Sequence, residues 1–191
     1  YGYRFVNSEG LERLDGIRVL ILPDCYYLSQ REAEAIDAWV RKGGTLLVEA
    51  HAGGYNDDTG RHSRRLPGLG LDDKWNLREK NTTSTFRLKL DTQEGVNVRL
   101  SEDAAKALRD FGVSGGPYVP VAMRNGDILW GALRYAELDA PDADTLGAFR
   151  PGTACIVRKK IGDGTLYYCG TNVGEGSFKN KAAFDALLGE V

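Results

Sequence analysis

Residues 17–51 constrain the fold more than any other part of the chain. An apolar run at 17–22, interrupted only by Arg18, leads through a helical segment and a Gly-Gly stop into a second apolar run at 45–50. Strands that are apolar on both faces are typical of a parallel sheet covered by helices on each side. Because the link from helix to second strand is short, the segment predicts a right-handed strand–helix–strand unit.

The predicted helix of this unit has clear start and stop signals. Ser29 and Glu32 have the spacing of a capping box, in which each side chain binds the backbone amide at the other position. Ala33, Ile36 and Val40 then repeat at helical spacing and predict a buried stripe. Basic residues in the last turn and a following glycine are typical of a helix C-terminus.

The composition excludes several classes of protein. A chain of 191 residues can bury a real core, and we expect residues 1–191 to form one domain. A formal net charge of −2 gives no reason to expect nucleic acid or an anionic membrane as a partner. No apolar run approaches the ~20 residues of a membrane-spanning helix. Three cysteines are an odd and sparse set, which favours a reducing compartment and therefore the cytoplasm.

The remainder of the chain adds strands, helices and one hairpin. An Asp-Gly pair at 163–164 indicates a tight hairpin turn. The only methionine is Met123, and the chain opens on a strand already under way, so we expect a fragment or a processed product. The further elements are predicted at 3–6 (strand), 9–14 (helix), 102–111 (helix), 132–138 (strand), 153–159 and 166–169 (the hairpin strands) and 181–188 (helix).

His51 stands directly after the second strand of the opening unit. In open α/β sheets, ligands bind beyond the carboxyl ends of the strands. One interpretation of His51 is therefore an imidazole that faces a ligand. The other is a loop histidine with a local hydrogen bond, which is favoured because no nucleophile or second base stands beside it in the sequence.

The polar loop after His51 supplies the other candidate ligand or pocket-rim residues, Asn56, Asp57 and Arg61. It resembles a calcium loop only loosely, because the distal glutamate of an EF-hand is missing, so we expect no metal. The basic run at 61–65 reads as a solvated loop that pairs with neighbouring aspartates. A contact with another subunit or with an anionic ligand is the alternative.

No catalytic residue is predicted. Glu49 and Glu137 are the only acids inside predicted strands, and nothing places them together as the paired carboxylates of a glycosidase. The Gly-x-Ser-x-Gly sequence at 112–116 follows a predicted helix and lies in a loop, so it does not have the strand-to-helix setting of a nucleophile elbow. Cys25 has no histidine near it in the sequence, so a structural thiol is favoured. No Gly-x-Gly-x-x-Gly opens a helix after a strand, and we expect no cofactor.

Several motifs resemble a known family. They are IRVLILPD at 17–24, AWVRKGGTLLV at 38–48, AHAGGYND at 50–57, LPGLG at 66–70 and IGDGTLYYCGT at 161–171. Together they resemble the class I glutamine-amidotransferase-like fold. More closely, they resemble the β-galactosidase trimerisation domain, the middle domain of glycoside hydrolase family 42 enzymes.

The resemblance implies a flavodoxin-like, mostly parallel sheet with helices on both faces, followed here by the C-terminal hairpin. Amidotransferases carry a nucleophilic cysteine where this chain has Ala50, His51 and Ala52, so glutaminase chemistry should be absent. The trimerisation domain has no catalytic residues of its own. It forms the contact between subunits, as in a homotrimer, and helps to wall the active site of a linked TIM barrel. Such domains start with a central strand and a helix that have no counterpart before residue 3.

Three hypotheses follow. The leading one is a non-catalytic assembly and active-site-shaping domain of a β-galactosidase-like or other carbohydrate-active enzyme, whose parent chain is a glycoside hydrolase. The second is a free-standing sugar-binding or sugar-modifying protein of the trehalose-utilisation type, with a site at His51, Asn56, Asp57 and Arg61. The third is a scaffold without a small-molecule site.

Overall fold

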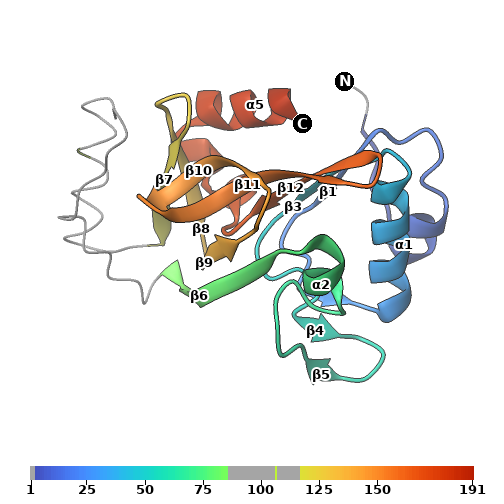
Figure 1. Cartoon of the computed structure of the whole chain (residues 1–191). Coiled ribbons are helices and arrows are strands. Elements are labelled where there is room, and N and C mark those ends of the chain that lie inside the picture. The colour runs from blue at the N-terminus through green and yellow to red at the C-terminus, as the bar shows by residue number, and fades with distance from the viewer. Residues whose placement is uncertain (1–2, 86–105, 107–116) are drawn as a thin grey trace.

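The computed structural model describes residues 3–85, 106 and 117–191 (Figure 1). The strands are β1 (Val19–Leu22), β2 (Tyr27–Leu28), β3 (Thr45–Val48), β4 (Tyr55–Asn56), β5 (Arg61–His62), β6 (Arg78–Ser84), β7 (Tyr118–Met123), β8 (Ile128–Ala132), β9 (Arg134–Asp139), β10 (Asp144–Arg150), β11 (Thr153–Ile161) and β12 (Gly164–Cys169). The helices are η1 (Ser8–Glu12), α1 (Gln30–Arg41), α2 (Leu71–Trp75), α4 (Val173–Gly176), η3 (Ser177–Lys179) and α5 (Lys181–Glu190). Apart from Lys106, the predicted helix at 102–111 lies outside the described residues.

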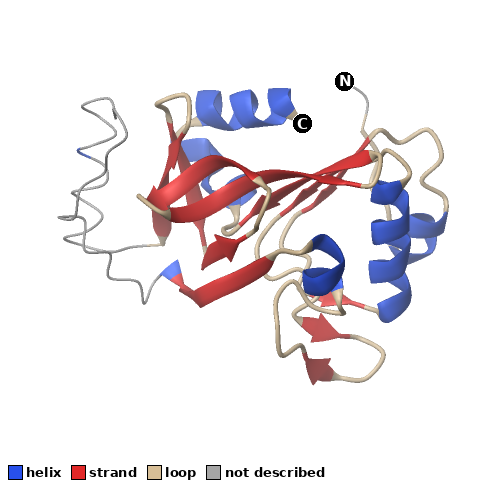
Figure 2. Cartoon of the chain, in the orientation of Figure 1, coloured by secondary structure: helices blue, strands red, loops and turns tan. Residues whose placement is uncertain are grey.

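A seven-stranded mixed sheet dominates the structure, in the order β1-β3-β12-β11-β10-β7-β8. Strands β1, β3 and β12 are parallel neighbours, whereas β12, β11, β10, β7 and β8 pair antiparallel. Two smaller sheets accompany it, β2-β4-β5 and β6-β9. Figure 2 shows the curl of the large sheet, with α5 and α1 on different sides of it.

The prediction of a flavodoxin-like, mostly parallel sheet with helices on both faces is wrong. The large sheet is a curled mixed sheet, resembling half a barrel, with only a few short helices against it (Figure 2). The physical reason lies in the connections after residue 117. Short turns join β7 to β8, β10 to β11 and β11 to β12, and these pairs are antiparallel because a parallel pair needs a longer crossover.

The predicted C-terminal hairpin is confirmed as β11 and β12. Its turn consists of residues 162–163, with Gly162 at a φ of +61°, between the paired ends Ile161 and Gly164. The hairpin is not an appendage, however, because β12 also pairs in parallel with β3. It therefore occupies the middle of the sheet.

The predicted strand–helix–strand unit is confirmed as β1–α1–β3, with Val19 paired to Thr45 and Leu22 to Val48. The backbone N–H of Ser29 donates to Glu32 Oε2 at 2.7 Å, and the N–H of Glu32 donates to Ser29 Oγ at 3.2 Å. The predicted helix at 9–14 appears as the shorter η1. The predicted strand at 3–6 is wrong, because those residues form no regular structure.

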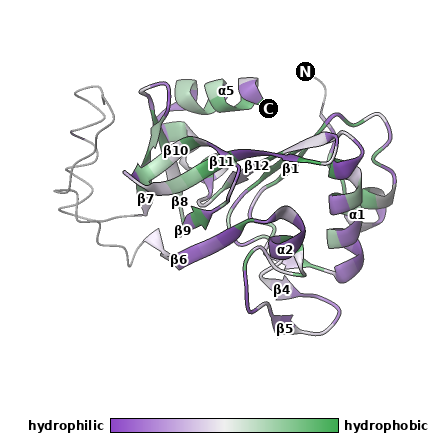
Figure 3. Cartoon of the chain, in the orientation of Figure 1, coloured by the Kyte–Doolittle hydropathy of each residue, from purple (hydrophilic) through white to green (hydrophobic). Residues whose placement is uncertain are grey.

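The large sheet has an apolar core on each face. Leu46 and Val48 of β3 pack in the cluster that includes Ile36 of α1, whereas Leu47 between them packs in the cluster that includes Leu187 of α5. This division follows from the two-residue alternation of a strand. Figure 3 shows the contrast with β6, which is hydrophilic along its length. Among the described residues, no helix is long and apolar enough to cross a membrane.

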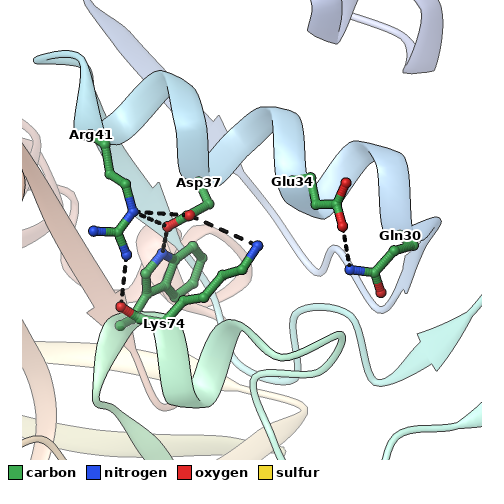
Figure 4. Close-up of polar contacts among 6 residues, drawn as sticks. Gln30, Glu34, Asp37, Arg41 and Lys74 are labelled. Carbon is green, nitrogen blue, oxygen red and sulfur yellow. Dashed lines mark hydrogen bonds and ion pairs between the residues drawn. The ribbon is translucent and has the colours of Figure 1, made fainter.

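A buried carboxylate joins α1 to α2 (Figure 4). Asp37 Oδ1 accepts a hydrogen bond from Trp75 Nε1 at 3.0 Å, and the same carboxylate pairs with Arg41 Nε at 3.0 Å and Lys74 Nζ at 3.9 Å. Trp75 is almost fully buried and packs edge-on against Tyr168 of β12. Asp37 therefore satisfies an indole N–H that has no access to water.

We expect Asp37→Ala to lower the free energy of unfolding by about 2 kcal/mol, because it leaves the buried Trp75 N–H without an acceptor. Asp37→Asn should cost less, since its side-chain oxygen can still accept that bond. The matched control is Glu34→Ala on the exposed side of α1, which should change stability by no more than about 0.5 kcal/mol. Urea denaturation measures all three, and equal losses for Asp37→Ala and Glu34→Ala would contradict the assignment.

Candidate functional site

Glu49 forms hydrogen bonds with the loops beyond the carboxyl ends of β1 and β12. Its buried carboxylate accepts from the backbone N–H groups of Asp24 (3.1 Å) and Gly174 (2.7 Å) and from Asn172 Nδ2 (3.2 Å). Burial raises the pKa of Glu49, and these hydrogen bonds oppose that effect. Because each bond reaches a different loop position, the carboxylate has a structural role where a catalytic acid could otherwise stand.

His51 lies beside a second buried carboxylate. It adopts a φ of +68° directly beyond β3, and its backbone N–H donates to Glu79 Oε1 at 2.6 Å. The Tyr168 hydroxyl donates to the same oxygen at 2.5 Å. The imidazole Nε2 lies 3.4 Å from Glu79 Oε2. The side chain of Glu79 is fully buried, so β6 is tied through it to the ends of β3 and β12.

The sequence offered no signal for Glu79. It lies in the stretch at 51–84 that shows no periodicity, and β6 contains no apolar residue that would indicate a strand. Only the tertiary pairing of β6 with β9 turns this side chain inward.

Both members of this pair are neutral in mildly acidic solution. Burial, reinforced by the Arg134 guanidinium, lowers the pKa of His51 to about 4, while the Asp24 carboxylate opposes this. Burial raises the pKa of Glu79 to about 7 despite the hydrogen bonds from Tyr168 and His51. Although 3.4 Å also suits an ion pair, both shifts disfavour the charged forms.

A proton on Glu79 Oε2 would give two buried polar atoms, Glu79 Oε2 and His51 Nε2, a hydrogen-bond partner. Neither Glu79 Oε2 nor His51 Nε2 has another hydrogen-bond partner among the described residues. A carboxylic acid donates and a neutral imidazole nitrogen accepts, so the protonated form of Glu79 satisfies both. The arrangement places a proton between Glu79 Oε2 and His51 Nε2 inside the fold.

At about pH 5.5, the Glu79–His51 pair binds one proton both in the unfolded and in the folded chain, but on a different residue in each state. At about pH 5.5 the unfolded chain carries it on His51, whose ordinary pKa is 6.5, and the folded chain carries it on Glu79. The raised pKa of Glu79 gives stability that is lost as the pH rises from 4.5 towards 7. The lowered pKa of His51 gives stability that is gained as the pH rises from about 4 to 6.5. The two effects therefore cancel between about pH 4.5 and 6.5.

Two of the predicted site residues lie side by side on the β4–β5 hairpin. Asn56 pairs with Arg61 across the two strands, and Asn56 Oδ1 accepts from the Thr59 N–H at 3.0 Å to close the turn. Asp57 follows on the exposed turn. No hydrogen bond or ion pair in the described part of the chain links these three residues to His51. The predicted four-residue cluster is thus divided between the hairpin and the buried pair.

The basic run at 61–65 does not pair with the neighbouring aspartates as predicted. Arg65 instead lies 3.7 Å from Asp72 and 3.6 Å from Asp73. A pocket of about 160 Å³ opens beside this run, lined by Arg64, Arg65, Leu66, Arg78, Glu79 and Thr82. Because the Glu79 side chain is fully buried, only its backbone can face this pocket.

The cysteines lie where thiol chemistry is disfavoured. Burial raises the pKa of the Cys25 thiol to about 11, and the nearby Glu32 and Asp24 carboxylates add to this. Cys155 and Cys169 are fully buried, and their pKa values are also raised by burial. Since the thiolate is the nucleophile, none of the three is activated. Among residues 3–85, 106 and 117–191, no group of three His, Cys, Asp or Glu side chains could hold a metal ion.

We expect the stability of Glu79→Gln to rise more steeply with pH than that of the wild type. The glutamine amide can donate to His51 Nε2 as the carboxylic acid does, but it does not titrate. The uncompensated His51 then makes the free energy of unfolding rise between about pH 4 and 6.5. Thermal unfolding at pH 4.5, 5.5 and 6.5 measures this slope, with Glu34→Gln on the exposed face of α1 as the control. Parallel slopes for wild type and Glu79→Gln would show that Glu79 is not protonated.

Comparison with known proteins gives structural relatives that include several glycosidases. No curated protein sequence matches the chain. The β-galactosidase of Bacillus circulans sp. alkalophilus is 17% identical with a TM-score of 0.58, over 88% of this chain and 23% of that one. The β-galactosidase of the haloarchaeon Halorubrum lacusprofundi is 19% identical with a TM-score of 0.60, over 91% and 22%. An exo-β-1,4-mannosidase from Opitutaceae bacterium strain TAV5 is 12% identical with a TM-score of 0.55, over 92% and 25%.

These identities show a shared fold, and the chain spans a quarter or less of each of these enzymes. A family model described as the β-galactosidase trimerisation domain matches residues 5–191. The match covers nearly the whole length of the sequence and agrees with the resemblance carried by its motifs. The chain therefore belongs to the β-galactosidase trimerisation domain family.

Proposed function

We propose that this chain is a non-catalytic domain that assembles a carbohydrate-active enzyme and shapes its active site. The observation that carries the proposal is the use of the polar groups at the strand ends. Glu49 is bound by three donors, and the buried Glu79 accepts from His51 and Tyr168. These side chains hold loops and sheets together, and none is available for a substrate.

The partners of the domain follow from its relatives. β-Galactosidases and an exo-β-1,4-mannosidase contain this fold as a fraction of a longer chain. We propose that the chain, as a single domain, is joined covalently to a TIM-barrel glycosidase and that copies associate as a homotrimer, with a carbohydrate as the ligand of the barrel. The three cysteines, free in the structure, support a reducing, cytoplasmic location.

The elbow after β3 supports a more distant relationship to class I glutamine amidotransferases. His51 has a positive φ at the position where such enzymes are expected to carry their nucleophile, and Gly53, also at positive φ, follows closely. A side chain on a sharp turn after a strand is typical of a nucleophile elbow. We propose that the scaffold retained this turn and uses it to place the backbone N–H of His51 against Glu79.

The alternative, a free-standing sugar-binding protein with a site at His51, is less well supported. His51 is 9% exposed and directed at Glu79, and Asn56 is used to close a turn. A screen of sugars and sugar acids by thermal shift distinguishes the two functions. A shift in Tm that disappears in His51→Gln would favour the alternative.

We expect the natural full-length protein to have three times the mass of its single chain in solution, because family members of this kind form the contact between subunits. Size-exclusion chromatography with light scattering measures this mass. Titration of salt provides the control for association that is only electrostatic. A monomer at every concentration would rule out the assembly function.

A further inference from the structure

Three arginines border the pocket between the loop after β5 and the start of β6. Arg64 and Arg65 come from the loop, and Arg78 is the first residue of β6. The loop is held against this strand because the backbone N–H of Glu79 donates to the carbonyl of Leu66 at 2.8 Å. The pocket of about 160 Å³ therefore lies between two segments whose backbones are bonded to each other.

Two aspartates outside the pocket hold two of these arginines. Arg65 Nη1 lies 3.7 Å from Asp72 Oδ2, and Arg78 Nε lies 3.6 Å from the same oxygen. Arg78 Nη2 also pairs with Asp73 at 2.9 Å. Neither aspartate lines the pocket. Because a guanidinium carries five N–H groups, these contacts position both arginines and still leave each of them donors for a ligand.

The third arginine, Arg64, has no such partner. It is exposed, and no hydrogen bond or ion pair joins it to any other residue that the structure describes. The rest of the lining adds no negative charge, since it consists of Leu66, Thr82 and the backbone of Glu79, whose side chain is buried against His51. Positive charge is thus concentrated at this pocket in a chain whose net charge is −2.

The charge of the pocket favours an anion, and its size favours more than a bare ion. Guanidinium groups bind carboxylate and phosphate oxygens in a planar, bidentate manner. A water molecule needs roughly 10–15 Å³ of such volume, so the pocket has room for about ten. That space suits a molecule of monosaccharide size. Thr82 offers a hydroxyl and Leu66 an apolar surface, which match the polar and apolar sides of a sugar ring.

We propose that this pocket binds a monosaccharide that carries an oxyanion, as a carboxylate or a phosphate. The anionic group lies among the three arginines, and the sugar ring lies against Leu66 and Thr82. The choice of a sugar rests on the proposed function in a carbohydrate-active enzyme, whereas the choice of an anion rests on the pocket alone. Since Glu79 borders the pocket and also ties β6 to the ends of β3 and β12, the ligand stabilises that connection.

The test is isothermal titration calorimetry on the natural full-length protein. The probes are D-galacturonate, D-galactose 6-phosphate, inorganic phosphate and neutral D-galactose. We expect Arg64→Gln to weaken binding of the charged sugars about tenfold, as for the loss of one charge-assisted hydrogen bond, and to leave binding of D-galactose unchanged. Thr82→Val removes the hydroxyl and should weaken the same binding about threefold.

The matched control is Arg61→Gln. Arg61 is an exposed arginine of the same basic run, but it does not line the pocket. It should therefore leave binding of every probe unchanged, whereas attraction by the general charge of the run would weaken in both arginine variants. The tighter of the two charged sugars shows whether the oxyanion is a carboxylate or a phosphate.

The outcomes separate this inference from the assembly function. The inference is overturned if neither charged sugar binds, if Arg64→Gln leaves their binding unchanged, or if inorganic phosphate binds as tightly as they do. Each of these results leaves the mass of the oligomer, and with it the assembly function, untouched. Should Arg64→Gln fail to fold, Thr82→Val must show the loss in its place.

Discussion

The parallel pairing of β12 with β3 is the constraint on which the rest of this structure depends. It runs from Thr165 opposite Thr45 to Tyr168 opposite Val48, and it joins the N-terminal strand–helix–strand unit to the antiparallel C-terminal strands. The same pairing places Tyr168 within hydrogen-bond distance of Glu79 and against Trp75, whose indole is bound by Asp37 of α1. One strand register therefore connects the core, the helix pair and the buried polar site.

The polar groups at the strand ends have a structural role in this fold. Buried carboxylates are costly unless they are paired or protonated. Glu49 is compensated by three donors and Glu79 by two donors and a proton, so both have a structural role. At about pH 5.5, folding replaces a charged imidazole and a carboxylate by their neutral forms, which removes two charges from a largely buried site.

The surface of the domain differs from this interior in the side chains that it carries. The small sheet outside the core carries contacts between the rings of Tyr27, Tyr55 and His62, whereas the Glu49 and Glu79 side chains are buried inside the fold. Among the described residues, the buried carboxylates at the strand ends are bound by structural partners. Membership of the β-galactosidase trimerisation domain family agrees with that division.

The sequence by itself determined the local elements: the capping box of Ser29 and Glu32, the apolar stripe of α1, and the hairpin of β11 and β12. These signals act between residues close in the chain, so they can be read without a fold. The position of β12 beside β3, the antiparallel majority of the sheet and the burial of Glu79 were decided only by tertiary structure. They depend on pairings between distant segments, and β6, which carries Glu79, has no apolar pattern of its own. Such a distant pairing also explains why His51 contacts Glu79 in the folded chain and not Asn56, Asp57 or Arg61.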